Sequence, residues 1–229
     1  MSHTHPDKID PLSIDCTIFG FEDGKLEVLL IRRAIEPSLG KWALPGGFIL
    51  YQEDIDEASR RILREMTGME RLFMEQQQAF GAVGRYPNRR VITLAYFALI
   101  QPGKYKLNAG PEASDIRWFD VRYLPELPFD HEEIIQHAVN TLRQKVRHQP
   151  IGFELLPEKF TLLQLQELYE AILGQKLDKP NFRRKMQGMN LLVSLEEYQT
   201  GVAHRAARLY KFDMTRYYKL KESGFVFEV

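Results

Sequence analysis

Hydrophobic residues in the first two thirds of the chain fall into two kinds of segment. Short runs rich in β-branched and aromatic residues, bounded by turn residues, predict β-strands. Five runs have this character: 13–21, 25–32, 73–81, 91–100 and 115–119. Two other segments carry apolar residues at helical spacing, one over 54–67 that ends at Gly68 and one that follows Asp130 as its N-cap. This pattern predicts a mixed α+β domain.

The hydrophobic pattern changes near residue 150. The segment 147–152 contains polar residues followed by Pro and Gly, which predicts a linker. Beyond it, Thr161 and Gln164 have the capping-box spacing of a helix start, and Asp178 is the expected N-cap of a second helix. Two β-rich segments come next, 191–196 and 208–212. We therefore predict two domains, 1–150 and 151–229.

The order helix, helix, hairpin in residues 151–229 is typical of a winged helix-turn-helix. Charge supports this interpretation, because residues 179–221 contain ten Lys or Arg and three Asp or Glu, a local charge of +7 (10 − 3). A basic helix followed by a basic hairpin suits a DNA groove and its flanking phosphates, and the alternative is a solvated basic face. The residues expected to contact a double-stranded operator are Lys179, Asn181, Arg183, Arg184, Gln187, His204, Arg205 and Arg208.

Composition excludes several other classes of protein. Hydrophobic residues make up 44% and charged residues 27% of the 229 residues, which is enough apolar material for a core. The single cysteine, Cys16, excludes an internal disulfide framework and lies in an apolar run, where packing is its expected role. The N-terminus lacks the apolar core of a signal peptide, and no run approaches the roughly 20 residues of a membrane span. We expect a soluble cytoplasmic protein that does not contact membranes.

Residues 44–69 carry the most specific motif in the chain. Gly47 is followed at fixed spacing by Glu53, Arg61, Glu65 and Gly68. This spacing resembles the Nudix box, the loop-helix-loop by which Nudix hydrolases hold a divalent metal against a diphosphate. The resemblance implies a Nudix α/β/α sandwich over about residues 10–147.

The metal-binding positions of the box depart from the family pattern. Three glutamates bind the metal in the family, and here they fall on Ile62, Glu65 and Met66. Because Mg²⁺ prefers oxygen ligands, Ile62 and Met66 offer it nothing, and both lie on an apolar stripe with Ile55 and Ala58. We expect no metal, no cofactor and no catalytic residue. The alternative is an active Nudix hydrolase that combines Glu65 with carboxylates from elsewhere.

The two halves together resemble the Nudix-related transcriptional regulators of the NrtR-like family. The segments that carry the resemblance are FTLLQLQELYEAILG (160–174), DKPNFRRKM (178–186), HRAARLYKFD (204–213) and the final GFVFEV. The resemblance implies that a metabolite binds the Nudix domain and releases DNA, with the chain acting as a repressor. Since two-fold operators mirror protein symmetry, we also expect a homodimer.

The family has one branch that responds to ADP-ribose in NAD metabolism and an AraR-like branch that responds to L-arabinose and controls pentose use. ADP-ribose-type Nudix proteins tend to carry Arg-Asp-Pro where this chain has GRYPNRR (84–90), so Tyr86 replaces the acid. We therefore expect a sugar such as L-arabinose, with an ADP-ribose-responsive regulator as the alternative. Asp15 is either a strand residue facing water or a polar anchor in the cleft. The candidate effector-binding residues are Asp15, Lys41, Phe48, Glu65, Arg85, Asp130 and His131.

Overall fold

The computed structural model describes residues 12–70, 72–201 and 205–228, and the chain divides into two compact units. The first unit ends at Ala138, and the second contains residues 139–229 together with two short segments, 21–26 and 99–101. Helix α2 (His131–His148) contributes to both units, with residues 131–138 in the first and 139–148 in the second. The division therefore falls inside this helix, before the boundary predicted at residue 150.

The first unit is built on a seven-stranded sheet. Its strands are β1 (Leu12–Glu22), β2 (Lys25–Arg33), β3 (Trp42–Ala43), β4 (Gly46–Phe48), β5 (Glu75–Phe80), β6 (Ile92–Ile100) and β7 (Ala113–Asp120). The order is β3-β2-β1-β6-β5, while β4 pairs with β1 and β7 pairs antiparallel with β2. β1 is buried on both faces from Ser13 to Gly20, as expected for a central strand. All five predicted strands are confirmed, and β3 and β4 are too short to leave a periodic signal.

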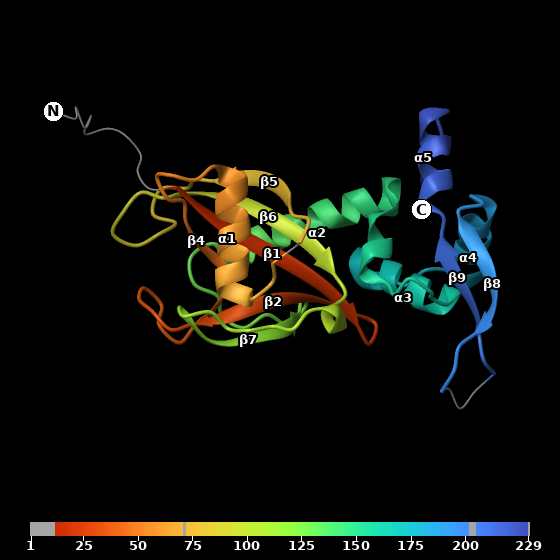
Figure 1. The fold of residues 1–229 in the computed structure, drawn as a ribbon, viewed down its shortest axis with the longest axis horizontal. Coiled ribbons are helices and arrows are strands. Elements are labelled where there is room, and N and C mark those ends of the chain that lie inside the picture. The colour runs from red at the N-terminus through yellow and green to blue at the C-terminus, as the bar shows by residue number, and fades with distance from the viewer. Residues whose placement is uncertain (1–11, 71, 202–204, 229) are drawn as a thin grey trace. The chain divides into compact units, whose positions relative to one another are not determined.

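Helices cover both faces of this sheet, with α1 (Ile55–Thr67) on one face and the first part of α2 on the other (Figure 1). This confirms the Nudix-type α/β/α sandwich. Asp54 and Glu57 form a capping box at the start of α1, and Gly68 ends the helix in the left-handed conformation, with φ of 77°. Ile62 and Met66 are buried, whereas Ile55 of the predicted apolar stripe is exposed because it lies in the first turn, before the helix reaches the core.

A linker is predicted from the sequence at residues 147–152, and that prediction is wrong. Residues 147–152 form the end of α2 and the start of a 3-10 helix, η2 (Pro150–Leu155). Gly152 packs closely here, because a Cβ atom at this position would lie 3.3 Å from a methyl group of Val146 and 3.4 Å from one of Leu168. The polar sequence suggested an exposed segment, but this packing keeps it ordered against the helices that follow.

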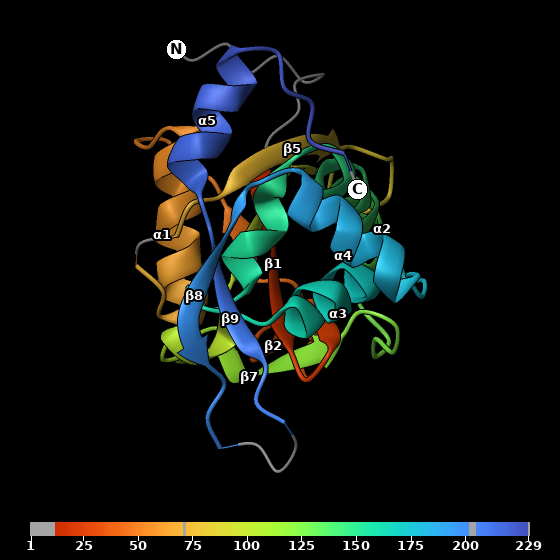
Figure 2. The same cartoon turned by 90° about the vertical axis from the view of Figure 1, so that its right-hand side faces the viewer.

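The remaining elements of the second unit form a winged helix (Figures 1 and 2). They are α3 (Leu162–Leu173), α4 (Lys179–Gly188), β8 (Leu192–Tyr198), β9 (Arg208–Phe212) and α5 (Met214–Glu222). The predicted caps are confirmed, since Thr161 and Gln164 form a capping box on α3 and Asp178 accepts a hydrogen bond from the Asn181 amide at the start of α4.

The core of this unit lies between α3 and α4, where Tyr169 packs against Phe182 with ring centroids 5.4 Å apart. The β8–β9 hairpin is extended by an antiparallel bridge between Phe160 and Tyr210, which ties the start of α3 to the wing. The winged helix-turn-helix prediction is therefore confirmed. α5 was not predicted, because Tyr217 is its only buried residue and gives no apolar stripe. In the described part of the chain, no helix is long and apolar enough to cross a membrane.

Candidate effector pocket and DNA interface

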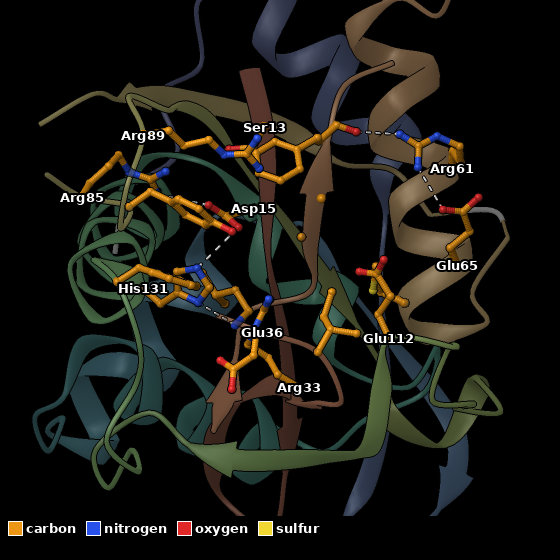
Figure 3. Close-up of a pocket in the computed structure, with 18 of the residues that line it drawn as sticks. Ser13, Asp15, Arg33, Glu36, Arg61, Glu65, Arg85, Arg89, Glu112 and His131 are labelled. Carbon is orange, nitrogen blue, oxygen red and sulfur yellow. Dashed lines mark hydrogen bonds and ion pairs between the residues drawn. The ribbon is translucent and has the colours of Figure 1, made fainter. Parts of the chain in front are cut away.

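A cavity of about 390 Å³ opens in the first unit beside the Nudix box. It is lined from β1, the β2–β3 segment, the box and the three loops that precede β6, β7 and α2 (Figure 3). The side chains that define its chemistry are Asp15, Arg33, Glu36, Phe48, Arg61, Glu65, Arg85, Tyr86, Arg89, Glu112, Phe129 and His131. A cavity of this size, with apolar walls and a few converging polar groups, is typical of a small-molecule site.

One wall of the cavity is a continuous chain of aromatic rings. Tyr86 lies between Phe48, at 5.9 Å, and Phe129, against which it stacks at 5.0 Å with an interplanar angle of 21°. Phe129 in turn contacts the His131 ring at 5.2 Å. Phe129 adopts a left-handed conformation, with φ of 60°, which is strained for an aromatic residue. The backbone thus holds this ring in the wall at an energetic cost, as is common at binding sites.

A buried ionic network lies behind this wall. Arg85 donates hydrogen bonds to both carboxylate oxygens of Asp130, at 2.7 and 2.6 Å, and a weaker one to Asp15 at 3.3 Å. Asp15 also accepts from the Thr93 hydroxyl at 2.8 Å. Burial lowers the pKa of Arg85, but the hydrogen bonds to Asp130 and the charge of Asp15 outweigh it and raise this pKa overall. Arg85 therefore stays charged, and its Nε and one terminal nitrogen are held by the two carboxylates.

His131 belongs to the same network and is neutral. Its Nδ1 accepts a hydrogen bond from the Leu44 amide at 3.0 Å, and its Nε2 lies 3.6 Å from Asp15. Burial lowers the pKa of His131, and the nearby Arg85 and Arg33 guanidinium groups lower it further, against the opposing effect of Asp15 and Asp130. Gly46 permits this arrangement, because a Cβ atom there would lie 2.3 Å from an Asp15 carboxylate oxygen.

Two arginines of the pocket, Arg33 and Arg89, have no ion pair among the described residues. The Arg89 guanidinium lies 4.3 Å from the Phe48 ring centroid and 5.4 Å from that of Tyr86. Arg33 lies 5.6 Å from the Phe129 ring centroid and donates through Nε to the Pro37 carbonyl. The aromatic wall is thus flanked by two cations whose terminal nitrogens remain available to an anionic ligand.

The Nudix box forms the opposite side of the pocket, where Figure 3 shows Arg61 and Glu65 on α1. Arg61 binds both carboxylate oxygens of Glu53, pairs with Glu65 at 2.9 Å and donates to the Phe48 carbonyl. The hydrogen bond from Arg61 lowers the pKa of Glu53 to about 2. The arginine therefore links the loop to the helix, as a structural rather than a reactive group.

The residues of the box do not fit the divalent metal that Nudix hydrolases use. Ile62 is fully buried and packs against Gly47, where a Cβ atom would meet its side chain at 3.2 Å. Met66 is buried as well, and Glu65 is paired with Arg61. Among the residues that the structure describes, no three His, Cys, Asp or Glu side chains are grouped to hold a metal ion. Of the three positions at which the family places metal-binding glutamates, only Glu65 thus offers an oxygen donor to Mg²⁺.

The structure brings together most of the effector-binding residues expected from sequence. Asp15 is the polar anchor of the cleft rather than a strand residue facing water. Asp130 directly precedes α2, as predicted, but it does not line the cavity and instead holds Arg85 with its carboxylate. Lys41 departs from the expectation, because it lies outside the pocket and pairs with Glu126 at 2.6 Å. Four further residues line the pocket that were not predicted from the sequence: Arg89, Phe129, Glu36 and Glu112. The three arginines of segment 84–90 were a usable signal for Arg89.

The expected DNA-contacting residues of α4 lie on its outer side, except one. Phe182 and Met186 are buried, while Asn181, Arg184 and Gln187 are exposed and Lys179 starts the helix. Arg184 donates to the Asn181 side chain at 2.5 Å, so these two groups are already aligned. Arg183 is only half-exposed, and its Nε is buried without a hydrogen-bond partner in the described part of the chain. The aliphatic part of the Arg183 side chain therefore lies toward the core. The helical wheel places this residue on the outer face with Arg184.

The wing presents a different arrangement from the one expected. Arg208 on β9 donates to the Tyr198 and Ser194 hydroxyls across the hairpin, at 3.1 and 3.3 Å, so its guanidinium is partly engaged. Arg205 is exposed at the end of the loop that joins the strands. His204, the remaining expected contact, lies outside the described residues.

Comparison with known protein families gives two matches along the chain. Residues 11–138 match the NUDIX domain, and residues 152–212 match the NrtR DNA-binding winged helix domain. The chain is 34% identical over 209 residues to the ADPR responsive transcriptional repressor NtrR of Acinetobacter baylyi, covering 90% of this chain and 83% of that protein.

Two solved structures of Shewanella oneidensis NrtR are similar to this chain. One is the complex with a 27mer DNA, with a TM-score of 0.73 and 30% identity, which covers 94% of this chain and 97% of that one. The other is the NUDIX domain complexed with ADP ribose, with a TM-score of 0.53 and 32% identity, which covers 59% of this chain and 90% of that one. The chain therefore belongs to the NrtR-like family of DNA-binding regulators, in which a Nudix domain precedes a winged helix.

Proposed function

We propose that this regulator is a repressor whose Nudix domain binds ADP-ribose, or a closely related nucleoside diphosphate sugar, and then releases its operator. The observation that carries the proposal is the presence of two arginines, Arg33 and Arg89, beside the aromatic wall of the pocket, neither of which has an ion pair in the described chain. A diphosphate needs cationic donors and a purine needs a flat apolar surface, and this pocket offers both. The Acinetobacter relative is named as ADP-ribose responsive, which agrees with this chemistry.

Each part of such a ligand has a matching set of residues in the pocket. The Phe48, Tyr86 and Phe129 rings suit the base, and the free nitrogens of Arg33 and Arg89 suit the two phosphates. The carboxylates of Glu36 and Glu112 can accept hydrogen bonds from ribose hydroxyls. Arg85 is assigned no phosphate, because Asp130 and Asp15 already neutralise it.

The role of Tyr86 in effector binding differs between the sequence and the folded chain. In the sequence alone, the replacement of an acid by Tyr86 favours an effector other than a nucleotide. In the folded chain, however, Tyr86 stacks on Phe129 and so enlarges the apolar surface available to a base. The relatives likewise lend no support to L-arabinose, and a neutral pentose would leave both cations without a partner. ADP-ribose therefore fits better than the sugar.

We further propose that the domain binds its effector without hydrolysing it. This part of the proposal rests on Ile62 and Met66, which are buried apolar residues where the family places carboxylates. Incubation with ADP-ribose and either Mg²⁺ or Mn²⁺ tests it directly. Turnover on the order of 1 per second, an ordinary enzymatic rate, would show that the domain is an active hydrolase.

The effector is tested by titration of the protein with ADP-ribose, NAD and L-arabinose, followed by DNA binding in the presence of each. We expect ADP-ribose to bind and to weaken DNA affinity, while L-arabinose does neither. A hundredfold loss of DNA affinity corresponds to a coupling free energy of about 2.7 kcal/mol. The result that overturns the proposal is DNA release by the sugar with no response to ADP-ribose. The same experiments, run with light-scattering mass determination, test the homodimer that a two-fold operator requires.

A further inference from the structure

Helix α5, beyond the winged-helix match that ends at residue 212, carries an exposed set of cations. Its buried side is formed by Tyr217, with Leu220 partly covered, whereas Arg216, Lys219 and Lys221 are exposed. None of these three cations has an ion pair among the residues that the structure describes. Glu222 is the only acid in the helix. The exposed side chains of α5 therefore carry a net positive charge.

The placement of one of these cations opposes the stability of the helix itself. Backbone amides at a helix N-terminus favour nearby anions, so Arg216 in the first turn of α5 is unfavourably placed. α1 and α2 follow the favourable pattern, with two acids each in their first turns. α5 has an Asp N-cap, then a cation and no acid in its first turn. Among the helices of the described chain, only α4, the expected DNA-contacting helix, has the same arrangement. Helix stability thus does not account for Arg216, whereas an anionic partner does.

α5 is also anchored to the end of α4. The Asp213 amide, at the N-cap of α5, donates to the Leu191 carbonyl at 2.9 Å, and Leu191 lies three residues after α4. Lys211 of β9 and Lys221 of α5 border the same cavity, together with the exposed Tyr218. β9 leads directly into α5, which extends away from the loop end of the hairpin (Figures 1 and 2). Exposed cations thus continue from the hairpin onto α5.

We propose that α5 is a third DNA-contacting element, which binds phosphates of the operator beyond those reached by α4 and the wing. Arg216, Lys219 and Lys221 supply the charge, and the Tyr218 hydroxyl can donate to a phosphate oxygen. Such contacts carry no sequence information, but they add affinity and fix the register of α4 on the duplex. The partner is the same operator duplex, and the effector plays no part in the inference.

The experiment uses the full chain and a duplex enriched from a random pool by the unmodified protein. The triple variant Arg216→Gln, Lys219→Gln, Lys221→Gln is compared with the unmodified protein in DNA titrations from 50 to 200 mM salt. We expect the slope of log affinity against log salt to become less steep by about 1 per chain for each phosphate that the variant no longer binds. Hydroxyl-radical footprinting should show weaker protection at the edges of the site, with the central protection retained.

Two further variants make the result specific. Arg60→Gln, Arg64→Gln, Lys104→Gln removes the same charge from exposed positions of the first unit, and it should leave slope and footprint unchanged. Arg216→Lys, Lys219→Arg, Lys221→Arg keeps the charge and should keep both as well, so a change there would indicate a folding defect. The inference is overturned if the glutamine variant of α5 has the same slope and footprint as the first-unit control.

Discussion

The Arg85 guanidinium binds both carboxylate oxygens of Asp130, at 2.7 and 2.6 Å, and thereby fastens the arginine-rich loop of the pocket to the start of α2. Both side chains are largely withdrawn from water, with exposed fractions of 4% and 13%. The pair thus links the two pocket segments that contain Tyr86 and Phe129, which together form the stacked part of the aromatic wall.

Asp130→Asn should destabilise the first unit strongly, because it removes a negative charge and leaves Asp15, at 3.3 Å, as the only carboxylate among the described residues paired with the buried Arg85. Breaking a buried pair by neutralising one partner costs about 3–5 kcal/mol. Urea denaturation at pH 7.5 measures the change. Glu126→Gln is the matched control, since it breaks the exposed pair with Lys41 and should cost less than about 1 kcal/mol. Equal effects of the two variants would mean that the Arg85–Asp130 pair contributes little.

Arg89→Ala should weaken ADP-ribose binding, because it removes both the proposed phosphate donor and the cation over Phe48. A hydrogen bond to a charged group contributes about 1.5–3 kcal/mol, which corresponds to a roughly 10- to 150-fold rise in Kd. Isothermal titration calorimetry measures it. Arg90→Ala is the control, since the neighbouring Arg90 donates to the Ala82 carbonyl and lies outside the pocket. Should Arg90→Ala weaken binding as much as Arg89→Ala, the arginine assignment would be wrong.

Part of the pocket could be predicted from the sequence alone. The box motif and strand pattern located the cleft, and Asp15, Phe48, Glu65, Arg85 and His131 do line it. Their partners were not predictable, because the network joins residues up to 116 positions apart, such as Asp15 and His131, through the strand order β2-β1-β6. The short strands β3 and β4 were not predicted, for a related reason. β3 and β4 are held by pairing with β2 and β1 rather than by any local pattern.

In the second unit, too, local signals were predicted correctly, whereas features that depend on tertiary packing were not. The caps and apolar stripes of α3 and α4 are local signals, and sequence reasoning placed both helices correctly. The segment 147–152 is polar, yet it is helical because Gly152 packs against Val146 and Leu168. Arg183 was assigned to the DNA-facing side by angle alone, whereas the structure buries its Nε. Long side chains reach beyond the face on which their Cα lies, so a helical wheel misplaces them.

Arg184→Ala should weaken operator binding by about 1–3 kcal/mol if its guanidinium contacts a base edge. The hydrogen bond from Arg184 to Asn181 aligns the two side chains on the exposed side of α4 before DNA arrives. Arg183→Ala should instead lower stability more than it lowers affinity, because part of that side chain is buried. Titration of the enriched duplex at fixed salt and thermal denaturation separate the two effects. Equal affinity losses with unchanged stability would place both arginines in the groove.

Acidification should destabilise the first unit through His131. Its pKa is lowered in the folded state, so the native protein binds fewer protons than the unfolded chain and the histidine contributes stability above about pH 6.5. That contribution is lost as the pH falls below 6.5, at up to about 1.4 kcal/mol per pH unit for one group. The groups that face His131 are the carboxylates of Asp15 and Asp130 and the guanidinium groups of Arg85 and Arg33.

The range from pH 7.5 to 5.5 separates His131 from Glu53, whose lowered pKa of about 2 affects stability only below about pH 4.5. His131→Gln can still accept the Leu44 amide hydrogen bond through its side-chain oxygen, but it cannot titrate. Urea denaturation of both proteins across this range should show a steep loss for the unmodified protein and a flatter profile for the variant. Parallel stability profiles of the two proteins would assign the pH dependence to other groups. A flat profile of the variant would identify protonation of His131 as the cause, because protonation places a positive charge beside Arg85.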